Sequence, residues 1–471
     1  MAIASLFLIS LSLVLVSVDR GNAIVIAQSQ PSVCQETIYP VTDIDPSNIS
    51  IGEVAIESGI ARTGAHDDCK RVTPLPQGTR ARIVAQTTGP DRFKKIVPWY
   101  QLDYGAWIEA SAMSILTAPV PTQATIAVAD VRADTAKTEL VLPLSAPVPF
   151  EIQQNDRGFG ITLYNTTGKI SQLNLPPALT TAASPLVKTP APTSQSLAIG
   201  SITSSPSPTS PTVQPLQWAA NKFITLPNTG IATASWQAPT SDRVQINLQL
   251  RAQQQWGYQT AYRNNSLVIT LRNPPQLSRN PQKPLSGLTV VVDPGHGGID
   301  SGAVGRAYGN TYLEKTVNMQ MSEYLQRALI DRGANVVMTR TTDINPSLDD
   351  RQVIINRTLP VVSISIHHDA GTPGRSSGAS IYWYQPQSQN FAAFLLDYFS
   401  TQGNRPILNN RGVIWRSFAL ARPSNTPAVL LEVGFMTDPP EITDLARPAR
   451  QQELAGVLAD GIAQWVVSKA S

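Results

Sequence analysis

The last third of the chain alternates short apolar runs with longer stretches of helical periodicity. Apolar residues recur at helical spacing from Val317 to Leu329, and Gly333 follows as a stop signal. The same patterns predict helices over 348–356, 391–399 and 454–467, and strands from residue 288 and over 335–339, 361–366, 379–384 and 428–431. Strands that alternate with helices predict one α/β domain over residues 286–471, with a largely parallel or mixed sheet flanked by helices on both faces.

The residues before this domain show the shorter period of β-strands. Alternating runs broken by turn residues predict a small β-barrel domain over residues 31–117, with strands at 80–85, 99–102 and 106–109. A second β-rich region is predicted over residues 123–275, with strands at 138–142, 150–153, 159–163, 243–250, 256–261 and 266–271. Residues 176–215 are rich in Ser, Thr and Pro, which predicts a flexible linker or a long loop. The two pieces of residues 123–275 on either side of this segment are either separate domains or halves of one domain. The predicted fold class is multidomain, with small all-β domains before an α/β domain.

The start of the chain is typical of a signal peptide. Residues 3–18 are almost all apolar, and small residues follow up to Ala27, so we place the signal at residues 1–27. A retained membrane anchor is the alternative, although the run is short for a bilayer span. Export predicts a periplasmic or otherwise cell-wall-associated protein with no stable membrane span in the mature chain.

Charge and cysteine usage fit an exported protein. The net charge of +3 over 471 residues is close to neutral, so we expect no nucleic-acid partner. Cys34 and Cys69 are the only cysteines. After export they form one disulfide or remain two unrelated thiols, and neither has the spacing of a metal site.

Four residues with metal-binding or acid/base side chains fall at strand ends or helix starts of the predicted α/β domain. His296 follows the first strand after a Pro-Gly turn, Glu314 opens the first helix, and His367 and Glu432 close two later strands. Functional sites of open α/β sheets form at the carboxyl ends of strands. Two histidines and a carboxylate, with a fourth position left for water, suit catalytic zinc. We therefore expect His296, Glu314 and His367 to bind Zn²⁺.

Taken alone, each residue has a simpler explanation. His296 is compatible with a surface turn, Glu314 with the positive end of a helix dipole, and His367 with a hydrogen-bonded core histidine. Glu432 is harder to explain in this way, because a carboxylate after the apolar run 428–431 is costly to bury unless it is paired or functional. The four together favour a metal site.

The same residues stand in motifs that resemble those of the zinc-dependent N-acetylmuramoyl-L-alanine amidases of the bacterial cell-division type. The motifs are Asp-Pro-Gly-His-Gly-Gly, Leu-Glu-Lys, Ser-Ile-His and Leu-Leu-Glu-Val-Gly-Phe, in that order, between about Ser286 and the end of the chain. The resemblance implies that His296, Glu314 and His367 are zinc ligands and that Glu432 is the catalytic glutamate. It also implies a secreted peptidoglycan hydrolase that cuts the amide between N-acetylmuramic acid and L-alanine of the stem peptide.

The β-rich residues carry weaker resemblances. Residues 61–64, 75–79 and 99–108 are similar to bacterial SH3-like domains, which often bind the peptide part of the cell wall. Within this pattern, Trp99 and Trp107 are expected in the barrel core. Residues 123–275 resemble the AMIN-like β-domains that precede such amidases and target them to the wall.

The chain departs from the amidase pattern after the second histidine. The family usually has a small residue and Asn there, whereas His368 and Asp369 follow here. On an extended chain His368 points away from His367, although a role as an alternative ligand stays open. Arg340 and Arg351 also match polar positions of the family, and we expect both to form structural ion pairs.

The loop after His368 bears on regulation. Division amidases that are plugged by a helix carry a long insertion at about this point, whereas residues 370–378 are short and rich in turn residues. We therefore expect an open site that requires no activator protein.

Two other functions remain compatible with the sequence. A zinc peptidase that cuts another amide of the stem peptide would use the same metal site. A non-catalytic wall-binding protein would keep the fold alone, but the complete ligand set and Glu432 favour an enzyme.

Overall fold

The computed structural model describes residues 40–45, 50–117, 120–155, 157–176, 216–373, 375–403 and 409–470. The expected signal peptide, Cys34 and nearly all of the Ser/Thr/Pro-rich segment lie outside these residues. Cys69 is buried and disulfide-bonded. In the part of the chain that is described, no helix is both long and apolar enough to cross a membrane.

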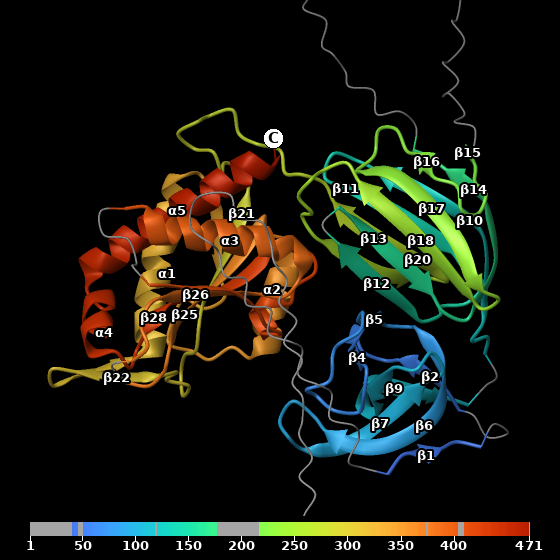
Figure 1. Ribbon diagram of the computed structural model, residues 1–471, viewed down its shortest axis with the longest axis horizontal. Coiled ribbons are helices and arrows are strands. Elements are labelled where there is room, and N and C mark those ends of the chain that lie inside the picture. Colours follow the sequence, from blue (N-terminus) through green and yellow to red (C-terminus); the bar gives the residue numbers. More distant parts are fainter. Residues whose placement is uncertain are drawn as a thin grey trace, which may run out of the picture.

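The described residues up to 117 form a small β-domain, called the N-terminal β-domain below, at the lower right of Figure 1. Its strands are β1 (Thr42–Asp43), β2 (Ser50–Val54), β3 (Ser58–Gly59), β4 (Ala61–Arg62), β5 (Leu75–Pro76), β6 (Arg80–Pro90), β7 (Ile96–Leu102), β8 (Trp107–Glu109) and β9 (Met113–Leu116). The main sheet has the antiparallel order β4-β8-β7-β6-β2-β9, and β1 pairs with β6. Trp99 and Trp107 are both buried, as expected of core residues.

The described residues of 124–176 and 216–272 form a two-sheet sandwich. Its strands are β10 (Ala124–Ala133), β11 (Lys137–Pro143), β12 (Phe150–Asn155), β13 (Gly158–Leu163), β14 (Thr166–Asn174), β15 (Leu216–Gln217), β16 (Ile224–Thr225), β17 (Ile231–Thr240), β18 (Arg243–Leu250), β19 (Tyr258–Arg263) and β20 (Ser266–Arg272). The sheets have the orders β15-β14-β10-β11-β20-β19 and β12-β13-β18-β17-β16.

The two β-rich pieces of sequence share this sandwich. Strand β11 pairs with β20, and β13 pairs with β18, so each sheet contains strands from both sides of the Ser/Thr/Pro-rich segment. One hydrophobic cluster, which includes Phe150, Ile161, Ile246 and Ile269, fills the space between the sheets. Neither piece has a hydrophobic core of its own.

The C-terminal α/β domain contains a mixed sheet of order β24-β21-β25-β28-β26-β27, at the left of Figure 1. Its strands are β21 (Thr289–Pro294), β24 (Asn335–Met338), β25 (Val362–Asp369), β26 (Ala379–Trp383), β27 (Asn410–Trp415) and β28 (Ala428–Phe435), and β22 (Val304–Ala307) pairs with β23 (Asn310–Leu313) outside it. The helices are α1 (Glu314–Asp331), α2 (Leu348–Thr358), α3 (Pro386–Thr401), α4 (Pro439–Leu445) and α5 (Pro448–Ala470). Only β26 and β28 pair antiparallel, so the expected mixed α/β sheet is present.

Both faces of this sheet are covered because side chains alternate along each strand. Val290 and Val292 point into the large core formed with α1, α3 and α5. Val291 points the other way and packs against Ile355 of α2 and the short 3₁₀ helix near Leu420. The smaller α2 layer leaves the carboxyl end of the sheet accessible, and this end carries the site.

The sandwich is docked onto the α/β domain through its core. Trp256, between β18 and β19, is 1% exposed and belongs to the hydrophobic core of the α/β domain. Its ring lies 5.3 Å from that of Trp465 in α5. The next residue, Gly257, has φ of +113°, and a Cβ there would lie 2.2 Å from the carbonyl carbon of Asn425. This close approach requires glycine.

We predict that Trp256→Ala lowers the free energy of unfolding by about 3–5 kcal/mol, because it leaves a cavity in the core of another domain. Urea unfolding of the full chain measures the loss. Phe223→Ala is the control, since Phe223 is an aromatic residue of the sandwich that is 66% exposed. An equal effect of both substitutions would contradict docking through Trp256.

Candidate metal centre

The first candidate ligand stands on a strained turn after β21. His296 has φ of +58°, a left-handed conformation that is unusual for a residue with a side chain. A Cβ on the preceding Gly295 would lie 2.3 Å from the ring of His367, so glycine lets the two histidines approach. Arg340, which is 3% exposed, donates to the carbonyl oxygens of Pro294 and Gly295 and holds the turn.

Glu314 is the first residue of α1 and is almost fully buried. Its carboxylate accepts hydrogen bonds from the backbone N–H groups of Ala303 at 2.8 Å and His368 at 3.1 Å, and from the side chain of Asn318 at 3.1 Å. These donors and the helix N-terminus compensate for the loss of water around the charge. The position of Glu314 is therefore fixed before any ligand binds.

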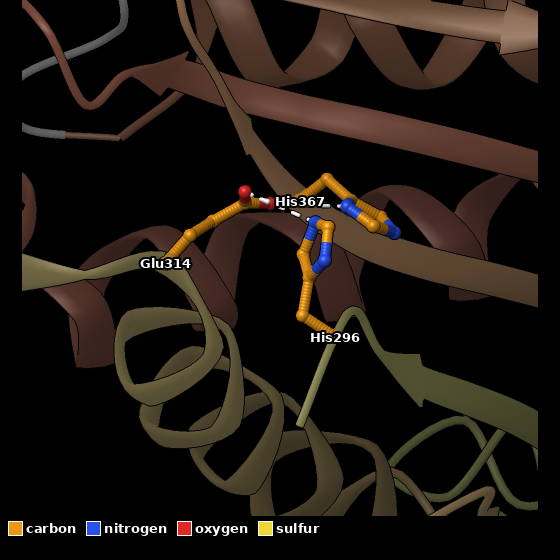
Figure 2. Close-up of side chains that lie close together, drawn as sticks. All are labelled: His296, Glu314 and His367. Atoms are coloured by element: carbon orange, nitrogen blue, oxygen red, sulfur yellow. Dashed lines mark hydrogen bonds and ion pairs between the residues drawn. The ribbon is translucent and has the colours of Figure 1, made fainter. Parts of the chain in front are cut away.

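The structure brings His296, Glu314 and His367 together, as Figure 2 shows. Glu314 lies between the histidines, with 3.0 Å from Oε2 to Nε2 of His296 and 3.0 Å from Oε1 to Nδ1 of His367. Their potential ligand atoms all lie within 4.8 Å of one another. The other ring nitrogen of His296, Nδ1, is 2.9 Å from Asp300 Oδ2.

The electrostatics of the cluster favour a bound cation. Burial would raise the pKa of Glu314, but the two histidines outweigh it and hold that pKa far below its usual range. Burial would likewise lower the pKa of His296, yet Glu314 and Asp300 raise it to about 8. The site thus attracts positive charge and holds a proton where a metal ion would sit.

The three residues fit zinc. Two imidazoles and one carboxylate leave a fourth position of a tetrahedral ion for water or substrate. Asp300 on the far nitrogen of His296 is the typical orienting partner of a metal-bound histidine. Gly302 leaves room for the cluster, because a Cβ there would lie 2.4 Å from Glu314 Oε2.

Glu432 faces the cluster from the neighbouring strand. It is the register partner of His367 in the parallel pair β25–β28, so both side chains lie on the same face of the sheet. Its Oε2 atom is buried without a hydrogen-bond partner. Burial, reinforced by the charges of Glu314 and Asp369, raises the pKa of Glu432 to about 9. A carboxyl group with a raised pKa and a buried oxygen that accepts no hydrogen bond has the character of a functional group.

The other polar residues singled out in the sequence take supporting positions. His368 is buried on the opposite face of β25, with Nδ1 2.7 Å from Asn318 Oδ1, and burial lowers its pKa to about 4. Arg351 forms the expected ion pair, at 2.8 Å from Asp293. The ion pair expected for Arg340 is wrong: its guanidinium donates to backbone carbonyls and contacts the Met319 sulfur, because it lies against the sharp turn after β21, where the carbonyls of Pro294 and Gly295 accept from it.

Sequence reasoning missed two supporting residues. Asp300 lies four residues after His296 in the glycine-rich loop, and Asn318 lies four residues after Glu314 in α1. Helical neighbours at that spacing face each other, so the position of Asn318 was a usable signal. The contact of Asp300 depends on the loop conformation, which the sequence pattern does not specify.

A cavity of about 640 Å³ opens at the metal centre. His296, His367 and Asp300 line it from the α/β domain. The N-terminal β-domain lines it too, with Asp67, Arg71, Arg92 and Phe93. The site therefore lies in a cleft between two domains that are far apart in the sequence.

Comparison with known proteins identifies the α/β domain. Residues 290–464 match the family described as N-acetylmuramoyl-L-alanine amidase. The C-terminal domain is an N-acetylmuramoyl-L-alanine amidase domain. Its match covers all the residues of the metal centre and Glu432.

Among curated relatives, the amidase domain is similar to the probable cell wall amidase LytH of Staphylococcus aureus, at 36% identity over 181 residues. That match covers 38% of this chain and 59% of LytH, so the chain spans less than two thirds of the length of this relative.

Two solved structures also match the amidase domain. The catalytic domain of CwlV from Bacillus (Paenibacillus) polymyxa var. colistinus is 32% identical, with a TM-score of 0.36 over 38% of this chain and 98% of that chain. The amidase AmiC2 of Nostoc punctiforme is also 32% identical, with a TM-score of 0.35 over 39% of this chain and 99% of that chain. The assignment of the domain rests on the sequence match.

We predict that the amidase domain binds Zn²⁺ with an affinity that falls as the pH is lowered through about 8, because His296 must lose its proton to become a ligand. Below this pKa, each pH unit costs about tenfold in affinity if one proton is released. Competition with a chromophoric chelator at several pH values, with the metal-stripped full chain, measures the slope.

His296→Ala abolishes this pH-dependent binding, whereas His66→Ala in the N-terminal β-domain leaves it unchanged. Zinc binding that survives in His296→Ala with the same pH slope would place the metal elsewhere.

Proposed function

We propose that this protein is a zinc-dependent peptidoglycan hydrolase that cuts the amide between N-acetylmuramic acid and L-alanine of the stem peptide. The observation that carries the proposal is the combination of a complete His296–Glu314–His367 ligand set with Glu432 on the adjacent strand, whose Oε2 atom is buried without a hydrogen-bond partner. His296 and His367 line the cavity, and all four residues lie in the segment that matches the amidase family.

Each protein group has a distinct role in the proposed hydrolysis. His296, Glu314 and His367 hold the ion, and Asp300 orients the ring of His296. Bound zinc supplies Lewis acidity, which acidifies water and polarises the scissile carbonyl. Glu432 accepts a proton from the attacking water and then donates it to the leaving nitrogen of L-alanine.

The raised pKa of Glu432 suits the second half of this cycle. A carboxyl group that holds its proton near neutral pH is an effective donor to an amine. A nearby divalent cation favours the ionised form, so the loaded site shifts Glu432 back toward the base that the first half requires. The buried side chain can therefore serve both steps.

The remaining parts of the chain fit a protein that works at the cell wall. We propose that the signal peptide directs export to the periplasm or wall, and that the SH3-like and AMIN-like regions bind peptidoglycan. The connection between β25 and β26, residues 370–378, is short in sequence, and we propose on this ground that the enzyme acts without an activator protein.

We predict that the full zinc-loaded chain releases intact stem peptides with a free L-alanine amino group from purified peptidoglycan, because the proposed bond joins L-alanine to the muramic acid lactyl group. Mass analysis of soluble products identifies the bond, and a chelator abolishes the release. Peptides cut within the stem would instead support a zinc peptidase, and no release from a folded, zinc-loaded chain would support a wall-binding protein.

We predict that Glu432→Gln binds zinc normally but lowers kcat by about 10²–10⁴-fold, because the amide keeps the shape of the side chain and cannot transfer the proton. Product release and zinc content are measured on the same preparation. Glu323→Gln, a matched change on α1, serves as the control. Near-normal turnover in Glu432→Gln would remove Glu432 from the mechanism.

A further inference from the structure

Two arginines without acidic partners line the cavity of the metal centre. Arg71 belongs to the N-terminal β-domain and Arg422 follows the short 3₁₀ helix of the amidase domain. Within the described residues, the side chain of Arg71 makes no hydrogen bond or ion pair. Arg422 makes one long contact, 3.4 Å to the Ser417 carbonyl, and its Nε is buried without a partner.

The acidic residues nearby are already paired with other arginines. Asp67 forms an ion pair with Arg62, which is 5% exposed. The carboxylate of Asp349 accepts hydrogen bonds from both terminal nitrogens of Arg92, at 2.9 and 2.8 Å. The guanidinium groups of Arg71 and Arg422 therefore line the cavity without an acidic partner among the described residues.

This arrangement is unfavourable without an anion. Burial, followed by the charges of Arg422 and Arg62, lowers the pKa of Arg71, and burial also lowers that of Arg422. Two like charges that are both partly desolvated raise the free energy of the folded protein unless a counter-charge binds between them.

Local structure holds Arg71 in place. Its backbone forms a β-bridge with Arg62, whose side chain donates to the carbonyl oxygen of Cys69 at 2.9 Å. The β-bridge and the buried side chain of Arg62 thus stabilise the loop between β4 and β5, and Arg71 of this loop lines the cleft.

Arg422 is held from the other side, because the N–H of Ala421 and that of Arg422 close the 3₁₀ turn onto Phe418 and Ala419. Both arginines line one cavity with His296 and His367, so a single extended ligand can reach the metal centre and the guanidinium pair together.

We propose that Arg71 and Arg422 form a carboxylate-binding subsite across the two domains, which receives a carboxylate of the peptide part of the substrate while the scissile amide lies at the metal centre. This inference rests on the proposed function. Guanidinium groups match a carboxylate in planar, two-point geometry, and a peptide substrate brings carboxylates that a glycan strand lacks. The N-terminal β-domain then completes the substrate cleft as well as binding the wall.

Steady-state kinetics of the full zinc-loaded chain test the subsite with two soluble muramoyl peptides. One ends in free carboxylates and the other has these groups converted to amides. Arg71→Gln and Arg422→Gln each raise KM for the free acid by about tenfold or more, with little change in kcat, because one charge-assisted contact is lost. Neither substitution changes KM for the amidated peptide, and Arg71→Lys restores part of the difference.

Arg82→Gln is the matched control, since Arg82 is an exposed arginine of the same β-domain outside the cavity. Unchanged melting temperatures show that the variants are folded. Equal losses on both peptides would assign the arginines a structural role, and no loss on either would overturn the subsite.

A binding measurement separates this inference from the proposed function. Calorimetric titration of the free-acid muramoyl peptide into the metal-stripped full chain needs no hydrolysis. Binding that Arg71→Gln abolishes and that amidation of the peptide abolishes supports the subsite even if the wild-type chain cuts neither peptide, in which case the proposed bond is wrong. Equal competition by inorganic phosphate would show a general anion site and overturn the assignment to peptide carboxylates.

Discussion

The geometry of the candidate metal centre depends on the buried carboxylate of Asp293, which is not one of the candidate ligands. Asp293, 1% exposed at the end of β21, accepts hydrogen bonds from Thr339 after β24 and Ser365 in β25, and an ion pair at 2.8 Å from Arg351 in α2. These contacts outweigh burial and hold its pKa below the usual range. Because Asp293 ties three adjacent strands and a helix together two residues before the Gly295–His296 turn, it fixes where that turn leaves the sheet. Loss of one partner would leave a buried charge uncompensated.

The surroundings of Glu314 and Glu432 shift the pKa values of these two carboxyl groups in opposite directions. Glu314 accepts backbone and side-chain hydrogen bonds between two histidines and stays ionised, whereas Glu432 has a buried oxygen with no donor and a raised pKa. In the proposed mechanism, this difference separates the metal ligand Glu314 from Glu432, the group that exchanges protons. The position of each residue in the fold explains its hydrogen bonding. Glu314 begins a helix, where free backbone N–H groups converge, whereas Glu432 lies inside a strand whose N–H groups are already bonded within the sheet.

Much of this site could be predicted from the sequence, because its residues follow apolar runs with strong periodicity. Strands β25 and β28 extend beyond the predicted ends, so His367 and Glu432 lie within strands, where register rather than a loop aligns them. The supporting contacts were less accessible. Asp300 reaches His296 only through a left-handed turn, and Trp256 enters the core of a domain that begins about thirty residues later. Such contacts depend on tertiary packing, which local patterns do not encode.

The position of the N-terminal β-domain at the cleft is set indirectly. Its contact with α2, the ion pair of Arg92 and Asp349, is half exposed, and such pairs contribute only about 0–1 kcal/mol. Its contacts with the sandwich are better buried: Thr73 exchanges hydrogen bonds with the backbone of Ile152, and the tilted rings of Tyr104 and Tyr164 lie 4.8 Å apart. The sandwich is in turn fixed to the amidase domain through Trp256. The sandwich therefore positions the N-terminal β-domain next to the metal centre. The geometry of the cleft depends on the packing of Trp256 in the core of the amidase domain rather than on the exposed ion pair of Arg92 and Asp349.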